Sequence, residues 1–69
     1  MKQALNALEE IYIEELPYIE DIEEKYSIEI VEYLIDIKLA EFLVDEEKDN
    51  RIYITGKGKA LLQQYEIIE

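Results

Sequence analysis

The sequence predicts a mainly α-helical domain with a small β-ribbon, an α+β fold in the order helix, helix, helix, strand, turn, strand, helix. Three observations predict it. Apolar residues recur at intervals of three and four in four separate segments, as in amphipathic helices. Two short runs of β-favouring residues, 42–44 and 52–54, enclose a polar stretch that suits a hairpin turn. The length of 69 residues allows one domain at most, so we expect a single domain over 1–69.

The first predicted helix covers residues 2–16. Its apolar positions follow one face of a helix: Leu5, Leu8, Tyr12 and Leu16, with Ala4, Ala7 and Ile11 beside them. Ile13 lies outside this face, and extra apolar surface on a helix often contacts a second chain. Alternatively, all of this surface belongs to the core of one chain.

Pro17 separates the first helix from a second helix, which is predicted over 17–25. Proline disfavours helical geometry in the residue before it and fits the first turn of a helix. The acids that follow, Glu20 and Asp21, lie in the early turns, where the helix dipole favours negative charge.

The third predicted helix begins after Ser27, a good N-cap residue, and runs to about Leu39. Strict alternation of apolar and polar residues fails twice in this stretch, which argues against a strand. On a helical projection of about 100° per residue, the core side holds Ile30, Leu34 and Ile37. The remaining surface carries the acids Glu29, Glu32 and Asp36, next to a second apolar stripe formed by Ile28, Val31 and Ile35.

A hairpin and a last helix complete the predicted domain. The two strand-like runs flank the polar stretch 46–50, which contains a turn-tolerant Asn50. Thr55 is expected to cap the last helix, and Gly56 and Gly58 are expected to loosen its first turn. The apolar face of this helix is expected to hold Leu61, Leu62, Tyr65 and Ile68.

The composition excludes several classes of function. With neither Cys nor His, the chain lacks disulfides, thiolate metal ligands and the commonest general base. The net charge is −11, and residues 1–50 hold 4 Lys/Arg against 16 Asp/Glu, which disfavours a general affinity for nucleic acid or anionic lipid. Without an apolar run that could span a bilayer or a signal-peptide core, we expect a cytoplasmic protein. Its richness in Ile, Tyr and Glu is compatible with a heat-adapted source.

No catalytic, cofactor or metal site is predicted. The adjacent carboxylates Glu9-Glu10, Glu14-Glu15 and Glu46-Glu47 are typical of solvated surface. The stretch 45–50 lacks the central Gly of a calcium loop. The run 56–59, Gly-Lys-Gly-Lys, lacks the spacing of a phosphate loop. We therefore expect a protein that is not an enzyme.

The order of elements over residues 17–65 resembles the winged helix-turn-helix superfamily, in particular small single-domain regulators of the MarR and PadR kind from bacteria, archaea and their viruses. Two motifs carry the resemblance: the apolar positions Ile30, Leu34, Ile37, Ala40 and Phe42-Leu43, and the run I-T-G-K-G-K-A-L-L at 54–62. The resemblance implies a recognition helix at 27–38 and a wing at 45–51. One departure is Glu41, which stands where these proteins usually have Gly.

The resemblance also implies which positions would face the major groove of DNA: Ser27, Ile28, Glu29, Glu32, Tyr33 and Asp36. Carboxylates there suit DNA poorly, because affinity comes mainly from Lys and Arg neutralising phosphates. They suit a protein partner with a basic surface better. The apolar stripe Ile28, Val31 and Ile35 would supply buried area, and Glu29, Glu32 and Asp36 would set orientation. We expect a regulatory protein that acts through protein contacts, as an adaptor or a nucleic-acid mimic in transcription or replication.

Two alternatives stay open. In the first, Val31 and Ile35 belong to the edge of the core and the acids are a solvated face. In the second, which the resemblance implies, the protein is a dimeric DNA-binding transcriptional regulator. Its phosphate contacts would be Lys48, Arg51, Lys57 and Lys59. We expect a homodimer through the first and last helices, because a chain this short buries only a small core.

Overall fold

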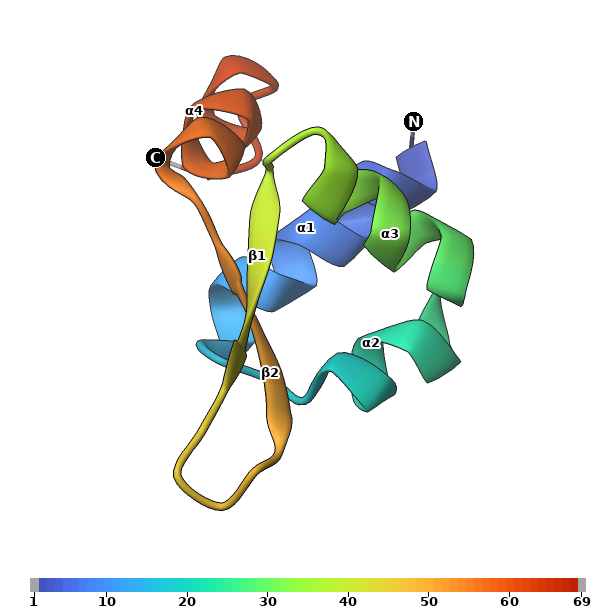
Figure 1. The fold of residues 1–69 in the computed structure, drawn as a ribbon. Coiled ribbons are helices and arrows are strands. Elements are labelled where there is room, and N and C mark those ends of the chain that lie inside the picture. The colour runs from blue at the N-terminus through green and yellow to red at the C-terminus, as the bar shows by residue number, and fades with distance from the viewer. Residues whose placement is uncertain (1, 69) are drawn as a thin grey trace.

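The computed structural model describes residues 2–68, which form four helices and one antiparallel pair of strands (Figure 1). In chain order these are α1 (Lys2–Glu14), α2 (Ile19–Lys25), α3 (Ile28–Asp36), β1 (Ala40–Val44), β2 (Asn50–Ile54) and α4 (Gly56–Gln64). The α+β class and the predicted order of elements are therefore confirmed. Among the described helices, none is long and apolar enough to cross a membrane.

Side-chain caps begin two of the helices where the sequence predicts them. The Ser27 hydroxyl oxygen accepts a hydrogen bond from the Ile30 amide at 3.2 Å, and the Thr55 hydroxyl oxygen accepts one from the Gly58 amide at 3.1 Å. Each bond satisfies an amide that has no partner inside its helix. Ser27 and Thr55 therefore fix where α3 and α4 start.

Three helices end earlier than predicted, and two of them, α3 and α4, end in the same way. After α3, Lys38 takes a left-handed φ of 67°, and the Leu39 amide donates to the Leu34 carbonyl at 2.9 Å. After α4, Glu66 takes a φ of 59°, and the Ile67 amide donates to the Leu62 carbonyl at 2.9 Å. This is the Schellman arrangement, which usually places Gly at the left-handed residue. Because Lys38 and Glu66 occupy these positions instead of Gly, the sequence does not indicate where either helix ends.

The second helix starts two residues later than predicted, because the segment before it lies along the hairpin. Pro17 is buried, and its carbonyl accepts a hydrogen bond from the Ile52 amide at 3.1 Å. Tyr18 forms an isolated antiparallel bridge with Arg51. This pairing holds 17–18 extended, so the prediction of a helix from 17 was wrong. The first helix stops at Glu14, with Glu15 and Leu16 at φ of 47° and 58°.

The hairpin pairs β1 with β2 in a register that sets Phe42 opposite Ile52. Its turn is closed by Asp45, whose carboxylate accepts from the amides of Glu47 at 2.9 Å and Asp49 at 3.0 Å. The same carboxylate accepts from Arg51 Nε at 3.1 Å. Both strands extend two residues beyond the predicted runs, because pairing recruits the flanking polar and small residues.

The core lies between the helices and one face of the hairpin. The residues buried there are Ala4, Ala7, Leu8, Ile11, Ile22, Val31, Leu34, Leu39, Ala40, Ile52 and Leu62. Along α1 the buried face is centred on Ala7, Leu8 and Ile11 instead of the predicted Leu5–Leu16 line, and Tyr12 and Leu16 are exposed. Tyr65 is also exposed, and Ile68 lies beyond the end of α4.

Gly58 has a different role from the predicted one. It is buried, and a Cβ added to it would overlap the carbonyl oxygen of Leu39 and lie 2.7 Å from Ile54 Cγ1. Its missing side chain therefore lets α4 approach the end of α3 and β2 closely. Gly56, by contrast, has open space around its Cβ position.

Candidate protein-interaction surface

The outward face of α3 carries the three predicted acids. Glu29, Glu32 and Asp36 are all exposed, and no Lys or Arg lies within Ile28–Asp36. We call these three residues the α3 acid ridge. The exposure of these residues confirms the prediction that the outward surface of this helix is acidic. That this surface binds a partner stays a prediction.

The apolar stripe predicted beside the ridge is broken in the middle. Ile28 is 57% exposed, but Val31 is 1% exposed, and Ile35 is half-buried against the core. The prediction that Val31 belongs to an exposed strip was therefore wrong. The reason is the rotation of α3 about its axis: the buried side of the helix is centred on Val31 and Leu34, and the expected core residue Ile37 lies at the edge of the core.

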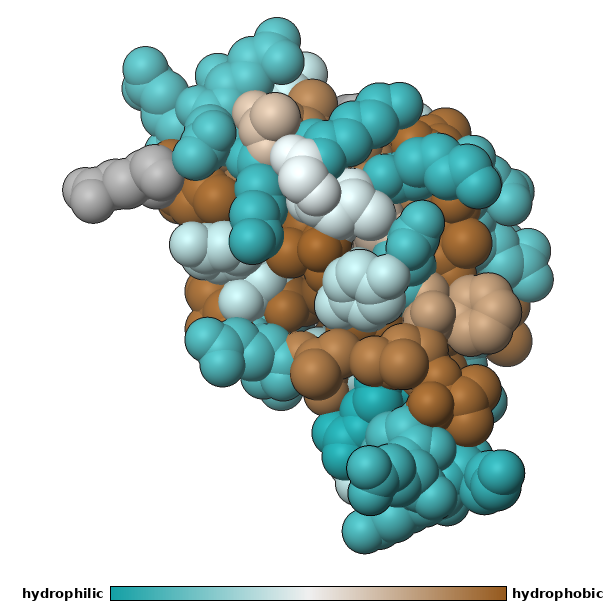
Figure 2. Space-filling view, turned by 60° about the vertical axis from the view of Figure 1, so that its left-hand side comes forward, coloured by the Kyte–Doolittle hydropathy of each residue, from teal (hydrophilic) through white to brown (hydrophobic). Residues whose placement is uncertain are grey.

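Exposed apolar surface also lies on β1, where the sequence did not indicate it. Phe42 is 59% exposed, Leu43 is 40% exposed and Val44 is 48% exposed. Figure 2 shows apolar surface gathered above the hydrophilic tip of the hairpin. A shallow hollow of about 180 Å³ connects this strand to α3 and is lined by Ile35, Lys38, Glu41 and Phe42.

The resemblance places Phe42 and Leu43 at apolar positions leading into the wing, but the alternation of side chains along a strand shows that both cannot be buried on one face. Successive strand residues point to opposite faces, so a run of three apolar residues cannot all face one core. The face of Phe42 and Val44 is the face of buried Ile52, yet the hairpin extends past the helices and leaves both residues uncovered (Figure 1).

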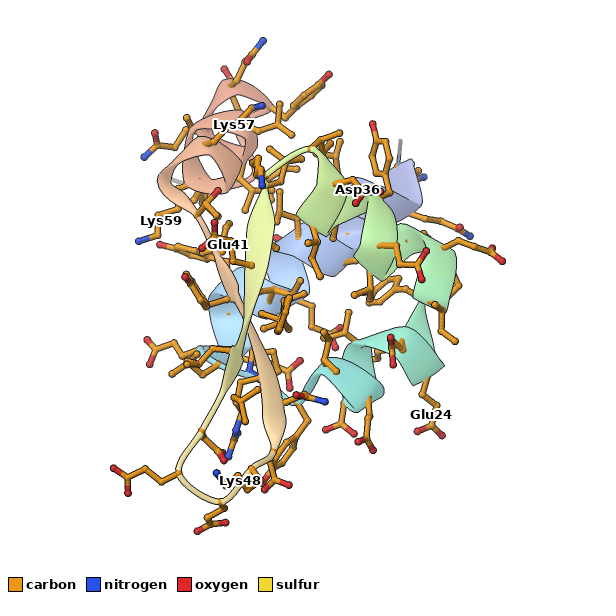
Figure 3. The ribbon with its side chains drawn as sticks, viewed as in Figure 1. Glu24, Asp36, Glu41, Lys48, Lys57 and Lys59 are labelled. Carbon is orange, nitrogen blue, oxygen red and sulfur yellow. The ribbon has the colours of Figure 1, made fainter. Side chains whose placement is uncertain are left out.

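The four predicted phosphate contacts do not form one cationic surface. Lys57 and Lys59 lie on α4, whereas Lys48 lies at the opposite end of the hairpin, in its turn (Figure 3). Lys57 Nζ donates to the Ile37 carbonyl at 3.1 Å. The positive charges are therefore divided between two ends of the molecule.

Arg51, the fourth predicted contact, is held inside the hairpin. Its guanidinium donates to Asp45 at 3.1 Å and to the Leu16 carbonyl at 3.0 Å, and lies 3.8 Å from the centroid of the Tyr18 ring. The hydrogen bond to Asp45 raises the pKa of Arg51. The Asp49 amide and then Arg51 hold the pKa of Asp45 below its usual range. Arg51 therefore stabilises the hairpin turn and the segment that precedes α2.

Glu41 does not form the turn into the hairpin. It is a strand residue opposite Tyr53, whose hydroxyl donates to it at 2.7 Å. This hydrogen bond raises the pKa of Tyr53. The left-handed turn residue is Lys38, so the Gly expected at 41 by the resemblance is replaced by a different turn geometry three residues earlier.

A second acidic cluster joins α1 to α2. Lys25 Nζ lies 3.0 Å from Glu10, and the Tyr26 hydroxyl donates to Glu10 at 3.2 Å. Burial raises the pKa of Glu10, but the hydrogen bonds from Lys25 and its neighbours outweigh burial and lower it. The pKa of Glu14 is raised, mainly by its hydrogen bond with Glu10. These contacts connect α1 to the end of α2, so the charges of Glu10 and Lys25 stabilise the fold.

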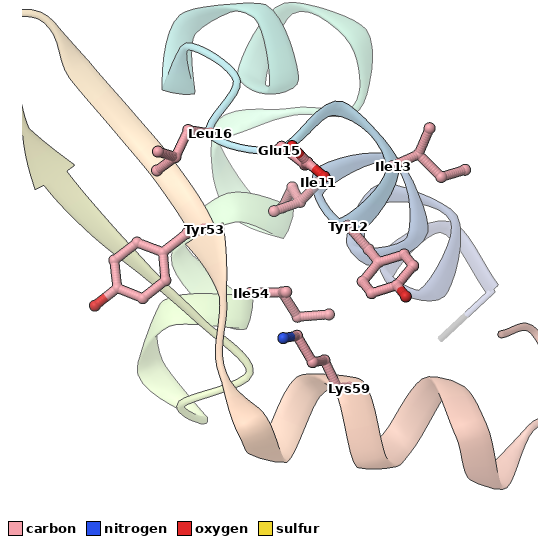
Figure 4. A pocket seen from close by; sticks show the side chains of 8 residues that line it. All are labelled: Ile11, Tyr12, Ile13, Glu15, Leu16, Tyr53, Ile54 and Lys59. Carbon is pink, nitrogen blue, oxygen red and sulfur yellow. The ribbon is translucent and has the colours of Figure 1, made fainter. Parts of the chain in front are cut away.

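A wider hollow lies on the other side of the molecule, between α1, β2 and α4 (Figure 4). It has a volume of about 480 Å³ and is lined by Ile11, Tyr12, Ile13, Glu15, Leu16, Tyr53, Ile54 and Lys59. Ile13 is 67% exposed there. Across residues 2–68, no group of three or more acidic side chains is placed to hold a metal ion.

No protein family, no curated protein and no solved structure matches this chain. Its function has to be inferred from the chemistry of these surfaces.

Proposed function

We propose that this chain is a small winged-helix regulatory protein that binds a basic polypeptide, as an adaptor or a nucleic-acid mimic in transcription or replication. The order of elements supports a winged-helix arrangement. So does the segment 17–18, which contacts β2 on the side away from β1 through an isolated bridge and one backbone hydrogen bond. In this arrangement α3 is the recognition helix, and the wing of residues 45–51 comprises the turn 45–49 and the first two residues of β2.

The α3 acid ridge is the observation that carries the proposal. Glu29, Glu32 and Asp36 occupy the surface that a winged-helix protein would insert into DNA. Placed near phosphates, three carboxylates would be repelled and would lose their hydration. Placed against a basic polypeptide, they would attract and orient it, and the exposed residues Ile28 on α3 and Phe42 on β1 would contribute buried apolar area.

The positions of the cations also support a protein partner over DNA. Binding energy for DNA comes from several Lys and Arg side chains that contact phosphates together. Here Arg51 is engaged by Asp45, and Lys48 is separated from Lys57 and Lys59 by the length of the hairpin (Figure 3). Lys57 contacts the Ile37 carbonyl just after α3, but Arg51 is engaged at the hairpin, so the four cations do not act together beside the ridge.

A homodimer through α1 and α4 remains part of the proposal. The exposed apolar residues Tyr12, Ile13 and Leu16 lie on the last part of α1 and just after it, beside the hollow that α4 borders. Burying an exposed Ile side chain contributes about 1.5–3 kcal/mol. For a domain with a small core, such a contact would add substantially to stability.

A matched pair of charge-reversal variants tests the proposed function. The first variant changes Glu29, Glu32 and Asp36 to Lys, and the second changes the exposed acids Glu20, Glu24 and Glu66 to Lys. Three reversals add six charges, so each variant has a net charge of −5 instead of −11. The probe is the basic peptide acetyl-Lys-Val-Lys-Val-Lys-Val-Lys-amide, titrated by calorimetry.

The expected result is a loss of about tenfold or more in affinity for the ridge variant and a much smaller loss for the control, because a local contact depends on position as well as on net charge. Equal losses in the two variants would show that the peptide responds only to overall charge. The proposal that α3 is the binding face would then be wrong.

A further inference from the structure

The outer edge of β1 has unpaired backbone groups. The Thr55 amide donates to the Leu39 carbonyl at 3.1 Å, and the Asp45 amide donates to the Asp49 carbonyl at 3.0 Å. In an antiparallel pair, hydrogen-bonded positions alternate along each strand. Glu41 and Leu43 therefore bond to β2, and the N–H and C=O groups of Ala40, Phe42 and Val44 point away from it. Ala40 is fully buried, so the accessible part of this edge is at Phe42 and Val44.

Nothing among residues 2–68 pairs with this outer edge as a strand. The opposite edge of the hairpin is different, because Pro17 and Tyr18 pair with β2 there. Natural edge strands are usually protected by Lys, Pro or a bulge. The strand β1 reads Ala-Glu-Phe-Leu-Val and contains no Lys or Pro, so its edge is open to a further strand.

The side chains next to this edge are apolar on both faces and acidic at both ends. Phe42 and Val44 flank it on one face and Leu43 on the other. The stretch 36–47 carries one cation, Lys38, against the acids Asp36, Glu41, Asp45, Glu46 and Glu47. An incoming strand is therefore favoured when it combines apolar residues at its centre with basic residues.

We infer that the protein partner adds an extended basic strand to the outer edge of β1, pairing its backbone with Phe42 and Val44. This inference rests on the proposed function and specifies how that partner is held. Backbone pairing supplies affinity, and side-chain contacts at alternate positions supply specificity. The α3 acid ridge, on the helix that packs against β1, then selects positive charge.

A second copy of this chain would also match the hydrogen-bonding pattern of the edge. Two copies paired through β1, however, would bring together two chains of net charge −11, with the acids of 36–47 from both near the junction. Like charges brought close together oppose association. Charge complementarity therefore favours a basic strand from another protein.

The test compares the basic peptide acetyl-Lys-Val-Lys-Val-Lys-Val-Lys-amide with the same peptide carrying N-methyl groups on its Val nitrogens. The methylated peptide keeps the charge and side chains but cannot donate along one edge. Amide hydrogen exchange by NMR reports which protein amides become protected. We expect new protection at Phe42 and Val44 with the unmodified peptide, and an affinity at least about tenfold lower for the methylated one.

A protein variant gives an independent readout. Val44→Pro removes one outward N–H on an edge strand, where proline is tolerated, and Val44→Ala removes the side chain but keeps that N–H. Val44→Pro is expected to weaken peptide binding about threefold or more relative to Val44→Ala, the effect of losing one hydrogen bond. Circular dichroism of both variants checks that they fold alike.

Three results would overturn the inference. Equal binding of the two peptides, with protection only on α3, would leave the proposed function standing and remove strand addition. Protection of Phe42 and Val44 without peptide, increasing with protein concentration, would identify a second copy as the occupant. Failure of the unmodified peptide to bind at all would count against both the strand and the proposed basic partner.

Discussion

Replacing Gly58 by Ala is expected to destabilise the protein, whereas replacing Gly56 by Ala is not. At Gly58 the new Cβ would overlap the Leu39 carbonyl oxygen and lie 2.7 Å from Ile54 Cγ1. That carbonyl cannot move freely, because it accepts hydrogen bonds from the Thr55 amide at 3.1 Å and from the Thr55 hydroxyl at 3.1 Å. Relief of the overlap therefore requires loss of hydrogen bonds or displacement of α4.

The magnitude follows from two opposing effects. Overpacking in a close contact costs about 1–3 kcal/mol, and loss of a hydrogen bond to Leu39 adds about 1 kcal/mol. Ala in place of Gly within a helix returns about 1 kcal/mol. The free energy of unfolding of Gly58→Ala should fall by about 2 kcal/mol, while that of Gly56→Ala should stay level or rise by up to about 1 kcal/mol.

The assay is urea unfolding followed by far-UV circular dichroism, with thermal unfolding as a second measure. For a domain of this size, about 2 kcal/mol corresponds to a decrease in Tm of about 8–16 °C. If Gly58→Ala proved as stable as Gly56→Ala, the close approach of α4 to Leu39 would not exist in solution, and the described packing of α4 would be wrong.

Three further predictions concern the turn residues and the dimer. Lys38→Gly should raise the free energy of unfolding by about 1 kcal/mol, because Lys38 holds a φ of 67°, while Lys38→Ala should give no such gain in urea unfolding. The pKa of Asp45 is depressed in the folded state, so its stabilising effect is present above its unfolded pKa of about 3.9 and is lost as the pH falls through the folded pKa. Asp45→Asn should therefore be less stable than the unmodified protein at neutral pH and converge with it in acid; a constant difference would contradict this. Ile13→Glu should shift sedimentation toward the monomer, whereas Ile28→Glu on α3 should leave it unchanged; equal behaviour would argue against a dimer contact through α1.

Local signals predicted much of the fold. Ser27 and Thr55 mark helix starts because their side-chain oxygens satisfy free amides, and that depends only on neighbouring residues. The hairpin follows from two β-favouring runs around a polar turn. The helix ends at Lys38 and Glu66 could not be predicted in the same way, because the left-handed geometry is imposed on residues that do not favour it.

The sequence predicted the acidic residues of the candidate site correctly, but it did not predict which apolar residues beside them are exposed. Charged residues must remain solvated, so the exposure of Glu29, Glu32 and Asp36 follows from their chemistry. Which apolar residues stay exposed depends on how α3 is rotated and on how far the hairpin extends. Both are set by tertiary packing, which buries Val31 and leaves Phe42 uncovered.

The most direct test of the central claim is titration of the protein with duplex DNA across a salt series from about 0.05 to about 0.2 M, beside the basic peptide under the same conditions. If the α3 acid ridge is a face for basic polypeptides, DNA should show no saturable binding even at the lowest salt, and the peptide should bind and weaken as salt rises. Tight DNA binding with a steep decrease as salt rises would contradict the claim and identify the protein as a DNA-binding regulator.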